Sequence, residues 1–525
     1  MRDNDILCHS QKCSNADRNI FQATLALKDR ITHMIKSKQR GKLISFDLDH
    51  AFDRVDRKFL HRTMCLLGFN PRLVNLLSRI ASLSSSRLIV NGHLSATFPI
   101  QRSVRQGDPL SMHLFVLYLH PLIKQLERIC ENDLVVAYAD DISIIASSSP
   151  KIDNIKKMFL KFEHVSGAKL NWDKTKAIDI GPSTMDIPWL QSTDSLKILD
   201  ITYASSIRQM ITINWNDAVS KFAQQLWRHS MRALTIHQKI TLLNTFITAK
   251  IWYLSSILPP YAVHIAKITS SMGTFLWNRI QERIPIQQLA RNRADGGLNL
   301  QLPVFKSKAL LINRHLKEIE SMPYYAECIR TNPANPPTDL PCLKLLILAI
   351  QILPNQMVQS PSSDVIHQHY IGTTDAPKVE RNFPLADWMR IWRNISTCAL
   401  TPVQREELYI FVNEITQHRK LSYSMRRVDN ESCLYCDATT ETIQHKFSQC
   451  TRVTAAWNMM QRRMRENMNG WRILSFEDLL RPSLLGIPRL QKTKILKMLI
   501  AYIGYIREND VIDMQTLECK LNAVL

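Results

Sequence analysis

The sequence lacks the segments that carry a chain into or across a membrane. It contains no run of about 18 apolar residues, whereas a membrane-spanning helix needs about 20. Residues 1–12 are polar and have no apolar core of the kind that a secretory signal requires. We therefore expect no membrane partner and an intracellular protein, for which nucleus and cytoplasm both stay open.

The cysteines do not form the pattern of a disulfide framework. The chain has 11 Cys, an odd number, scattered from Cys8 to Cys519. In a chain without a secretory signal, thiols usually stay reduced. We therefore expect free thiols.

Acidic residues are too few to balance the basic ones. The chain has 67 Lys and Arg against 46 Asp and Glu, a formal net charge of +21. This excess favours a polyanionic partner, most often nucleic acid, over a basic protein without one. Hydrophobic residues make up 45% of the chain, which is enough to bury real cores and argues against wholesale disorder. A length of 525 residues predicts three or four domains.

Repeats and long low-complexity tracts are absent, and helix and strand patterns alternate over residues 1–205. Residues 43–46 form an apolar run of strand type, and residues 134–145 predict two strands that flank a turn. Residues 87–100 alternate around Asn91-Gly92, which is typical of a hairpin. Helical patterns cover residues 56–83 and 109–126, the second with Pro109 in its first turn. The fold class of this region is therefore α+β.

The remainder of the chain has a different character. Residues 206–320 are dominated by helical patterns in which Lys and Arg outnumber Asp and Glu, so these bases are candidates for phosphate contact. The four tryptophans of this range are interpreted mostly as helix core: Trp215, Trp227, Trp252 and Trp277. Residues 321–380 are proline-rich and predict a linker with a helix inside it. Residues 381–525 form a last domain.

Three aspartates stand where metal-assisted phosphoryl transfer needs them. Asp47 ends the first apolar strand, and Asp140 and Asp141 occupy the predicted turn. Two Mg²⁺ ions in such a site clamp the attacking and leaving oxygens, and Mg²⁺ prefers oxygen ligands. A calcium loop after Asp47 is excluded, because Ala51 and Phe52 replace a ligand and a glycine. An ordinary acidic hairpin turn remains the alternative for the second motif.

Five segments in succession resemble the motifs of reverse transcriptases. Residues 47–55 (DLDHAFDRV) resemble motif A, 105–115 (RQGDPLSMHLF) motif B and 138–141 (YADD) motif C. Residues 166–176 (SGAKLNWDKTK) resemble motif D, and residues 196–203 (LKILDITY) resemble the primer grip. The residues of these motifs are most similar to those of non-LTR (LINE-type) retrotransposon enzymes. The resemblance implies a right-hand polymerase with an antiparallel palm sheet and an RNA-directed DNA polymerase activity.

The resemblance also implies residue roles. Asp47 and Asp140 would bind two catalytic Mg²⁺ ions, with Asp141 in support and the Leu48 carbonyl as a further ligand. Phe52 falls at the aromatic gate that disfavours a ribose 2′-hydroxyl.

Further roles follow from motifs B and D. Gln106 and Gly107 would lie against the incoming nucleotide and the template, and Lys174 would donate a proton to the leaving pyrophosphate. Asp200 replaces the usual glycine of the primer grip, and Asp suits a tight turn less well. Residues 18–20 resemble a fingers motif that normally follows a longer stretch of fingers sequence, so we expect an N-terminally truncated copy.

A second metal site is predicted near the C-terminus. Cys433, Cys436, His445 and Cys450 form a compact set that suits one tetrahedral Zn²⁺ ion. Four unmetallated side chains are the alternative. A Cys-Cys-His-Cys element after the polymerase is common in the LINE-type family, which favours a small zinc-knuckle-like domain. The nearby bases are candidates for phosphate contact: Arg426, Arg427, Lys446 and Arg452.

The sequence thus predicts partial fingers and palm over 1–205, a helical thumb over 206–320, a linker over 321–380 and a zinc-binding region over 381–525. The expected partners are an RNA template, a DNA primer or target, and deoxynucleoside triphosphates, with the oligomeric state open. Two alternatives remain. In the first, the chain is a catalytically silent nucleic-acid-binding remnant. In the second, it is a group II intron-type maturase, and the Cys-Cys-His-Cys element argues against this alternative.

Overall fold

The computed structural model describes residues 6–182, 185–278, 284–331, 337, 339–372, 375–467 and 474–524. The chain divides into two compact units, each assembled from three stretches of sequence. Unit 1 comprises residues 1–218, 252–261 and 307–365, and unit 2 comprises residues 219–251, 262–306 and 366–525. The predicted ranges do not coincide with these units, because residues 206–320 are shared between both.

A five-stranded sheet organises unit 1. Its strand order is β6-β7-β1-β8-β9, and every pairing is antiparallel except the short one between β8 and β9. The central strand β1 is almost entirely buried, as expected for a strand with a neighbour on each side and cover on both faces. The five strands are β1 (Gly41–Leu48), β6 (Leu134–Tyr138), β7 (Asp141–Ala146), β8 (Leu170–Ile180) and β9 (Gln191–Ser192).

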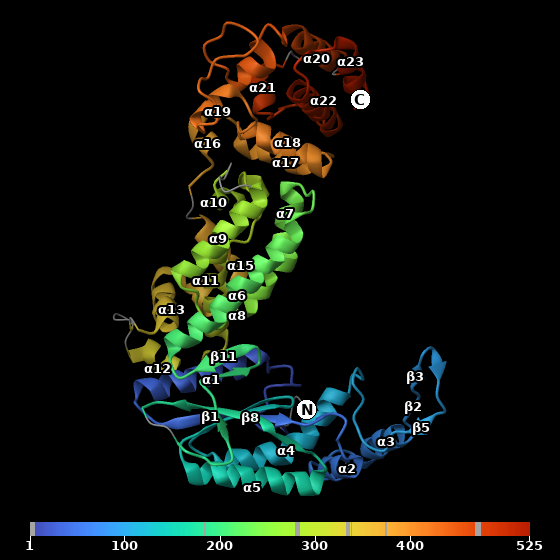
Figure 1. Cartoon of the computed structure of the whole chain (residues 1–525), viewed down its shortest axis with the longest axis vertical. Helices are drawn as coiled ribbons and strands as arrows, with labels where there is room; N and C mark the ends of the chain where they lie inside the picture. The colour runs from blue at the N-terminus through green and yellow to red at the C-terminus, as the bar shows by residue number, and fades with distance from the viewer. Residues whose placement is uncertain are drawn as a thin grey trace. The chain divides into compact units, whose positions relative to one another are not determined.

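Helices cover both faces of this sheet. Helices α4 (Ser111–Ile129) and α5 (Ser149–Ser166) lie on one face and α1 (Ile20–Lys36) on the other (Figure 1). The ring of Phe46 on β1 stacks on that of Phe159 on α5, with centroids 4.4 Å apart. Unit 1 is therefore an α+β layer structure with an antiparallel core sheet, as predicted.

Two predicted helices have different limits in the structure. The single helix expected over 56–83 is two helices, α2 (Arg57–Leu66) and α3 (Pro71–Ser82). Gly68 separates them with a φ of 79°, a left-handed conformation that ends a helix. Pro109 was expected in the first turn of its helix, but α4 begins at Ser111 after a turn stabilised by Asp108, whose carboxylate accepts from the Leu110 N–H.

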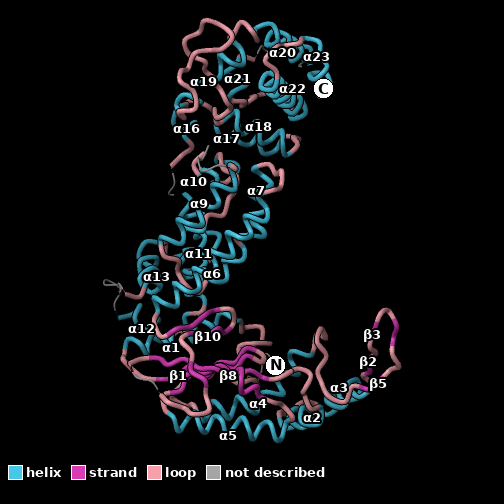
Figure 2. The backbone as a smooth tube through the Cα atoms, viewed as in Figure 1, coloured by secondary structure: helices cyan, strands magenta, loops and turns pink. Residues whose placement is uncertain are grey.

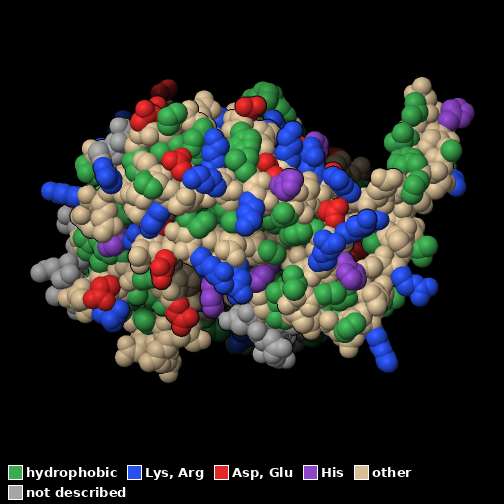
Figure 3. Space-filling model, turned by 90° about the horizontal axis from the view of Figure 1, so that it is seen from below, with side chains coloured by type: hydrophobic (Ala, Val, Ile, Leu, Met, Phe, Trp, Pro, Cys, Tyr) green, Lys and Arg blue, Asp and Glu red, His purple; other side chains and the backbone are tan. Residues whose placement is uncertain are grey.

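The predicted hairpin around Asn91-Gly92 projects from unit 1 as an arm (Figure 3). Strands β2 (Ser85–Ser86) and β5 (Phe98–Pro99) pair at its base, and β3 (Ile89–Val90) and β4 (His93–Leu94) pair at its tip. Asn91 and Gly92 have φ values of 50° and 83°, the two positive values that a type I′ turn requires. Hydrophobic side chains of the arm lie exposed, with Ile89 at 73% exposure.

The other elements of unit 1 are helical, apart from the hairpin of β10 (Ser195–Ile198) and β11 (Ile201–Ala204). Much of the predicted linker 321–380 is helical and belongs to this unit. Its helices are α12 (Pro323–Thr331), α13 (Pro341–Ile352) and α14 (Asn355–Gln359), after the 3₁₀ turn Ile319–Ser321. The boundary between the units falls inside four helices: α6 (Ile207–Ser230), α8 (Ala249–Ser255), α11 (Pro303–Lys317) and α15 (Ser363–Gly372).

In its described residues, unit 2 contains helices and loops, whereas the strands of Figure 2 belong to unit 1. Its helices are α7 (Ile236–Leu242), α9 (Ala262–Trp277), α10 (Ile286–Ala290), α16 (Lys378–Asn382), α17 (Trp388–Thr397), α18 (Pro402–Val412), α19 (Arg419–Ser424), α20 (Thr454–Asn467), α21 (Phe476–Leu480), α22 (Arg489–Glu508) and α23 (Met514–Asn522). Shorter helical segments are Leu243–Ile247, Arg293–Asp295 and His445–Gln449. Across the described ranges, no helix is both long and apolar enough to cross a bilayer.

Candidate active site and metal centre

The register of the sheet sets Asp47 beside Asp141, the first residue of β7, and beside the turn that carries Asp140. Phe46 on β1 pairs with Ile142 on β7, so the next positions along this antiparallel register are Asp47 and Asp141. On the other side of β1, the pairing with β8 shifts between Ser45 and Asp47. Irregular pairing of this kind redirects the side chains of a strand, and strand irregularities such as bulges are frequent beside active sites. The end of β1 thus presents Asp47 next to β7.

The turn between β6 and β7 holds Asp140. Tyr138 pairs with Asp141, so Ala139 and Asp140 form a two-residue hairpin loop. Ala139 has a φ of 55° and is buried, whereas a residue with a Cβ seldom adopts this left-handed conformation. Backbone strain of this kind persists only where the surroundings impose it, and it often marks a functional site.

The three carboxylates lie close enough to influence one another. Burial, together with the charges of Asp140 and Asp47, raises the pKa of Asp141 to about 6. Like charges gathered in this way repel, and a bound divalent cation relieves the repulsion. The structure therefore brings together the three aspartates that the sequence singled out, in a site that fits hard divalent cations.

Lys174 reaches the same site from β8. Its ammonium nitrogen lies 3.8 Å from a carboxylate oxygen of Asp47. The local backbone explains this approach, because the side chain of Asn171 accepts from the Lys174 N–H at 3.1 Å, within the segment where β8 bulges against β1. Lys174 is a solvated charge and also a neighbour of the aspartates.

Two other motif A residues follow Asp47 directly. Leu48 is the last residue of β1 and is buried, so its backbone is held beside the aspartates by the sheet. Phe52 is half-buried, and its ring stacks on that of Phe115 with centroids 4.4 Å apart and planes inclined by 16°. The stacking fixes the orientation of the Phe52 ring.

The motif B residues lie in an exposed loop before α4. Gln106 and Gly107 are both exposed, and Gly107 has a φ of 85°. No atom would lie within 4 Å of a Cβ added to Gly107, so the space beside it is open. The loop therefore leaves room for close approach of a ligand to the backbone.

The departure from the primer-grip pattern is accommodated in the turn between β10 and β11. Leu199 and Asp200 have φ values of 48° and 63°, so Asp200 adopts the left-handed conformation that glycine takes more easily. The Lys197 ammonium lies 2.7 Å from the Asp200 carboxylate. The hairpin forms with Asp at this position, which Asp tolerates better than most residues.

The predicted zinc ligands converge in unit 2. One ligand atom from each of Cys433, Cys436, His445 and Cys450 lies within 4.8 Å of all the others. The Cys433 and Cys450 sulfurs are 3.7 Å apart, those of Cys450 and Cys436 are 3.9 Å apart, and the Cys436 sulfur lies 3.3 Å from Nε2 of His445. Sulfurs on a tetrahedral zinc ion, each about 2.3 Å from the metal, are about 3.8 Å apart. The donor set therefore fits zinc.

The surroundings of this cluster are also typical of a metal turn. The Tyr435 N–H points at the Cys433 sulfur at 3.4 Å, and the Cys433 N–H donates to the Ala438 carbonyl at 3.0 Å. A hydrogen bond from the Ala438 backbone lowers the pKa of the Cys436 thiol, which favours the thiolate that binds metal.

Two of the basic residues near the cluster have internal partners. The Arg452 guanidinium lies over the Tyr435 ring and donates to the carbonyls of Asn509 and Asp510. The Lys446 ammonium donates to the Gln417 carbonyl. These internal contacts give Arg452 and Lys446 a structural role, so they are weaker candidates for phosphate contact than the sequence suggested.

Three exposed basic side chains lie close together within residues 206–320. The sequence showed an excess of Lys and Arg in this range but not which of these residues cluster. Arg228, Arg232 and Lys250 are exposed, and their charges lower the pKa of His229, after the effect of burial. We call these three residues the basic cluster. Trp227 precedes Arg228 and is 71% exposed, so the helix-core interpretation is wrong for this tryptophan, whereas Trp215 and Trp277 are buried.

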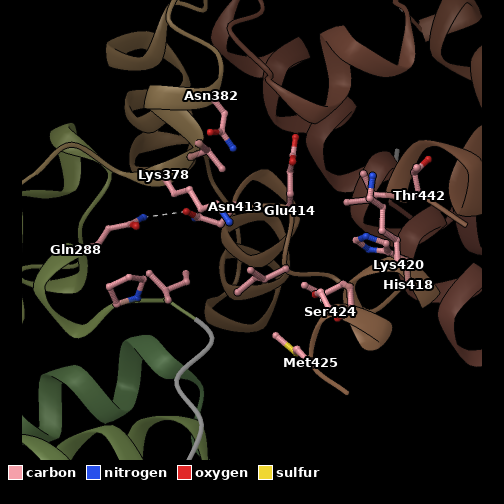
Figure 4. Close-up of a pocket in the computed structure, with 16 residues that line it drawn as sticks. Gln288, Lys378, Asn382, Asn413, Glu414, His418, Lys420, Ser424, Met425 and Thr442 are labelled. Atoms are coloured by element: carbon pink, nitrogen blue, oxygen red, sulfur yellow. Dashed lines mark hydrogen bonds between the residues drawn. The ribbon is translucent and has the colours of Figure 1, made fainter. Parts of the chain in front are cut away.

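Unit 2 also contains a cavity of about 560 Å³ with mixed lining (Figure 4). The Gln288 side chain donates to the Asn413 side chain on its wall at 2.9 Å. Lys378 and Lys420 lie at its edges with Glu414 between them, so the charges of the lining oppose each other. This cavity has no charge complementarity that selects a ligand.

Comparison with known proteins relates part of the chain to one family. Residues 5–214 match the reverse transcriptase (RNA-dependent DNA polymerase) family. Over 292 residues, 52% of the chain, the sequence is 25% identical to the transposon TX1 uncharacterized 149 kDa protein of Xenopus laevis, of which it covers 22%. It is 22% identical over 51% of the chain to the retrovirus-related Pol polyprotein from type-2 retrotransposable element R2DM of Drosophila melanogaster, of which it covers 27%.

The chain thus spans about a quarter of the length of these two relatives. Among solved structures, apo telomerase from Candida tropicalis aligns with 67% of this chain and covers 57% of the telomerase chain, at 12% sequence identity. The TM-score of 0.34 is too low to carry an argument. The sequence family and the paired aspartates at the strand ends agree. Residues 5–214 therefore match the reverse transcriptase family, and the two relatives named above are proteins of transposable elements.

Proposed function

We propose that this chain catalyses RNA-directed DNA synthesis, adding deoxynucleotides to a primer 3′-hydroxyl. The observation that carries the proposal is the meeting of Asp47, Asp140 and Asp141 at one end of the sheet, with the Lys174 ammonium 3.8 Å from Asp47. In this function the five-stranded sheet is the palm, and the aspartates sit at its reactive edge.

The proposed roles of the chain's own groups follow from their positions. Asp47 and Asp140 would hold the metal ions, and Asp141 and the Leu48 carbonyl would supply further oxygen ligands. Two bound Mg²⁺ ions would lower the pKa of the primer hydroxyl and neutralise charge on the leaving pyrophosphate. Lys174 is the proposed donor of a proton to the leaving group.

Substrate recognition is assigned to the residues around the aspartates. The Phe52 ring, fixed against Phe115, excludes a ribose 2′-hydroxyl and selects deoxynucleoside triphosphates. Gln106 and Gly107 contact the incoming nucleotide and the template, since their loop is exposed and open. The expected partners are accordingly an RNA template and a DNA primer or target.

The basic cluster of unit 2 supports binding of a nucleic acid backbone. Exposed Lys and Arg release counterions from phosphates and give affinity without sequence preference. The Zn²⁺ ion proposed for Cys433, Cys436, His445 and Cys450 has a structural role, because four protein ligands leave no open position for a substrate.

Primer extension tests the proposed function. The chain is incubated with an oligo(dT) primer on poly(rA), deoxythymidine triphosphate and Mg²⁺, beside an Asp140→Asn variant. We expect extension by the unaltered chain and a loss of about a hundredfold or more in the variant, because one metal ligand is removed. Equal extension by both proteins would point to a contaminating polymerase and overturn the assignment of Asp140.

A catalytically silent nucleic-acid-binding protein is the second candidate. Its supporting observation is Asp200 with a φ of 63° in the primer-grip turn, where glycine adopts this conformation with less strain. This candidate predicts salt-sensitive binding of an RNA–DNA duplex without any extension. That pair of results would replace the polymerase proposal.

A further inference from the structure

The turn that carries Asp140 contains two backbone groups which the hairpin itself cannot pair. In a two-residue hairpin loop the N–H and C=O of the first loop residue point away from the partner strand. Here that residue is Ala139, which is 6% exposed. A buried backbone group without a partner destabilises the fold, so both groups of Ala139 need hydrogen bonds from elsewhere.

One side chain supplies both hydrogen bonds. The Ala139 N–H donates to Oε1 of Gln11 at 3.2 Å, and Nε2 of Gln11 donates to the Ala139 carbonyl at 3.4 Å. Oε1 of Gln11 also accepts from the Cys13 N–H at 3.1 Å. Gln11 is 2% exposed, so no water competes for its amide. The amide thus pairs with Ala139 as a neighbouring strand would.

The backbone around Gln11 is itself aligned with β6. The Ala137 N–H donates to the Ser10 carbonyl at 2.8 Å, and the Lys12 N–H donates to the Ala137 carbonyl at 2.7 Å. This parallel bridge between Gln11 and Ala137 places the amide two residues from its target on the edge strand. Main-chain pairing with β6 therefore fixes the position from which the Gln11 side chain contacts Ala139.

The segment is in turn held by Arg18. Its guanidinium donates to the carbonyls of Cys8 and Gln11 at 2.6 and 2.7 Å, and to that of Leu7 at 3.2 Å. The Ser10 N–H donates to the Glu127 carboxylate at 2.9 Å. A charged group that donates to three carbonyls fixes a loop strongly, so Gln11 is positioned from both sides.

We infer that Gln11 is a positioning residue for the reaction: its amide holds Ala139 in the left-handed conformation that sets Asp140 and Asp141 for metal binding. The inference rests on the proposed polymerase function. Ala139 has a Cβ and is strained at its φ of 55°, so the turn relaxes toward another conformation when the amide is removed. A small displacement of the turn moves both carboxylates, since Asp140 and Asp141 follow Ala139 directly.

The test compares two variants of the full chain. Gln11→Met keeps the length and approximate volume of the side chain but removes its donor and acceptor. Gln515→Met, at an exposed position near the C-terminus, is the matched control. Three quantities are measured: the Mn²⁺ dissociation constant by electron paramagnetic resonance of free Mn²⁺, kcat and KM for the deoxynucleotide, and the midpoint of thermal unfolding. The Asp140→Asn variant gives the Mn²⁺ binding that belongs to other sites.

In Gln11→Met we expect a Mn²⁺ dissociation constant raised about tenfold and a kcat lowered about tenfold, because groups that orient metal ligands have effects of this size. The KM for the nucleotide should stay within about twofold, since no group that touches the substrate is removed. The control should match the unaltered chain. If Gln11→Met does not fold, Gln11→Asn decides, because its amide is one methylene too short to reach Ala139.

A merely structural Gln11 gives a different result. Its replacement would lower the unfolding midpoint, while Mn²⁺ affinity and kcat measured below that midpoint stay unchanged, and this outcome overturns the inference. Failure of the proposed function is distinguishable, because the unaltered chain would then show no extension. The Mn²⁺ measurement would still show whether Gln11 supports the aspartates.

Discussion

The ammonium nitrogen of Lys174 on β8 lies 3.8 Å from a carboxylate oxygen of Asp47 on the neighbouring strand β1. Both side chains keep access to solvent, Lys174 with 71% and Asp47 with 46% of the side chain exposed. An exposed ion pair contributes little to stability, so this pair is better explained by the chemistry of the site.

Replacing Lys174 tests its role as a proton donor. Lys174→Met should lower kcat by about a hundredfold, the usual effect of removing a general acid, with little change in KM. Lys174→Arg restores the charge but not an acid that releases its proton, so it should stay slow. Lys161→Met on α5 is the control. Recovery of full activity by Arg would show that only the charge matters.

Replacing Phe52 tests the steric gate. Phe52→Val removes the ring that stacks on Phe115 and should lower the preference for deoxynucleotides over ribonucleotides by roughly tenfold or more, because the space for a 2′-hydroxyl opens. The ratio of kcat/KM for the two triphosphates measures this. A control Phe59→Leu, in the aromatic core of the palm, should leave the ratio unchanged. A selectivity unchanged in Phe52→Val would exclude the gate.

Removing the basic cluster should weaken nucleic acid binding in a salt-dependent way. With Arg228, Arg232 and Lys250 all changed to Ala, the slope of log affinity against log salt should fall by about two to three, because each neutralised phosphate adds close to one to that slope. Fluorescence anisotropy of a labelled RNA–DNA duplex measures the slope. A variant with Lys157 and Lys161 of α5 changed to Ala is the comparison. An equal slope for the unaltered chain, the basic-cluster variant and the α5 variant would show that the basic cluster does not bind nucleic acid.

The cysteine–histidine cluster should hold about one zinc ion per chain. Cys436→Ser should lose this zinc and unfold at a lower temperature, because metal binding contributes directly to folding. Elemental analysis and thermal unfolding monitored by circular dichroism provide the measurements. Cys519→Ser, at an exposed cysteine outside the cluster, should behave like the unaltered chain. Zinc retained in full by Cys436→Ser would contradict the assignment.

The stability of unit 2 should decrease in acid because of His237. Burial lowers the pKa of His237 to about 4, and the charges of Arg293 and Arg405 act in the same direction. The unfolded chain, with an ordinary histidine pKa of 6.5, takes up the proton first as the pH falls. The contribution of His237 to the free energy of unfolding is therefore fully present above about pH 6.5 and is lost progressively as the pH falls toward 4.

Urea denaturation at pH 7.5 and pH 5.0 measures this decrease. His237→Phe keeps a ring of similar shape and should show a smaller difference between the two pH values. Some difference should remain, because burial also lowers the pKa of His418 and His264 in the same unit. His164→Phe, at an exposed position on α5, should retain the full difference. An equal pH dependence for His237→Phe and the unaltered chain would assign the effect to other groups.

The sequence by itself determined the features that depend on neighbours along the chain. The turn at Asp140, the hairpin at Asn91-Gly92 and the convergence of Cys433 with Cys436 follow from short spacings, because backbone turns and side-chain periodicity act over a few residues. The same local rules located strand β1, which carries Asp47 one residue before its end. They placed Asp47 on a strand and Asp140 in a turn, but they put Asp141 in the same turn, whereas it is the first residue of β7.

Only the tertiary structure decided which of these elements meet. Pairing of β1 with both β7 and β8 brings Lys174 to Asp47, and Gln11 reaches Ala139 across 128 residues of sequence. The exposure of Trp227 was equally hidden, because a helical pattern does not say which face another helix will cover. Long-range pairing depends on how buried faces fit together, and that free energy is shared over the whole core instead of residing in any one segment.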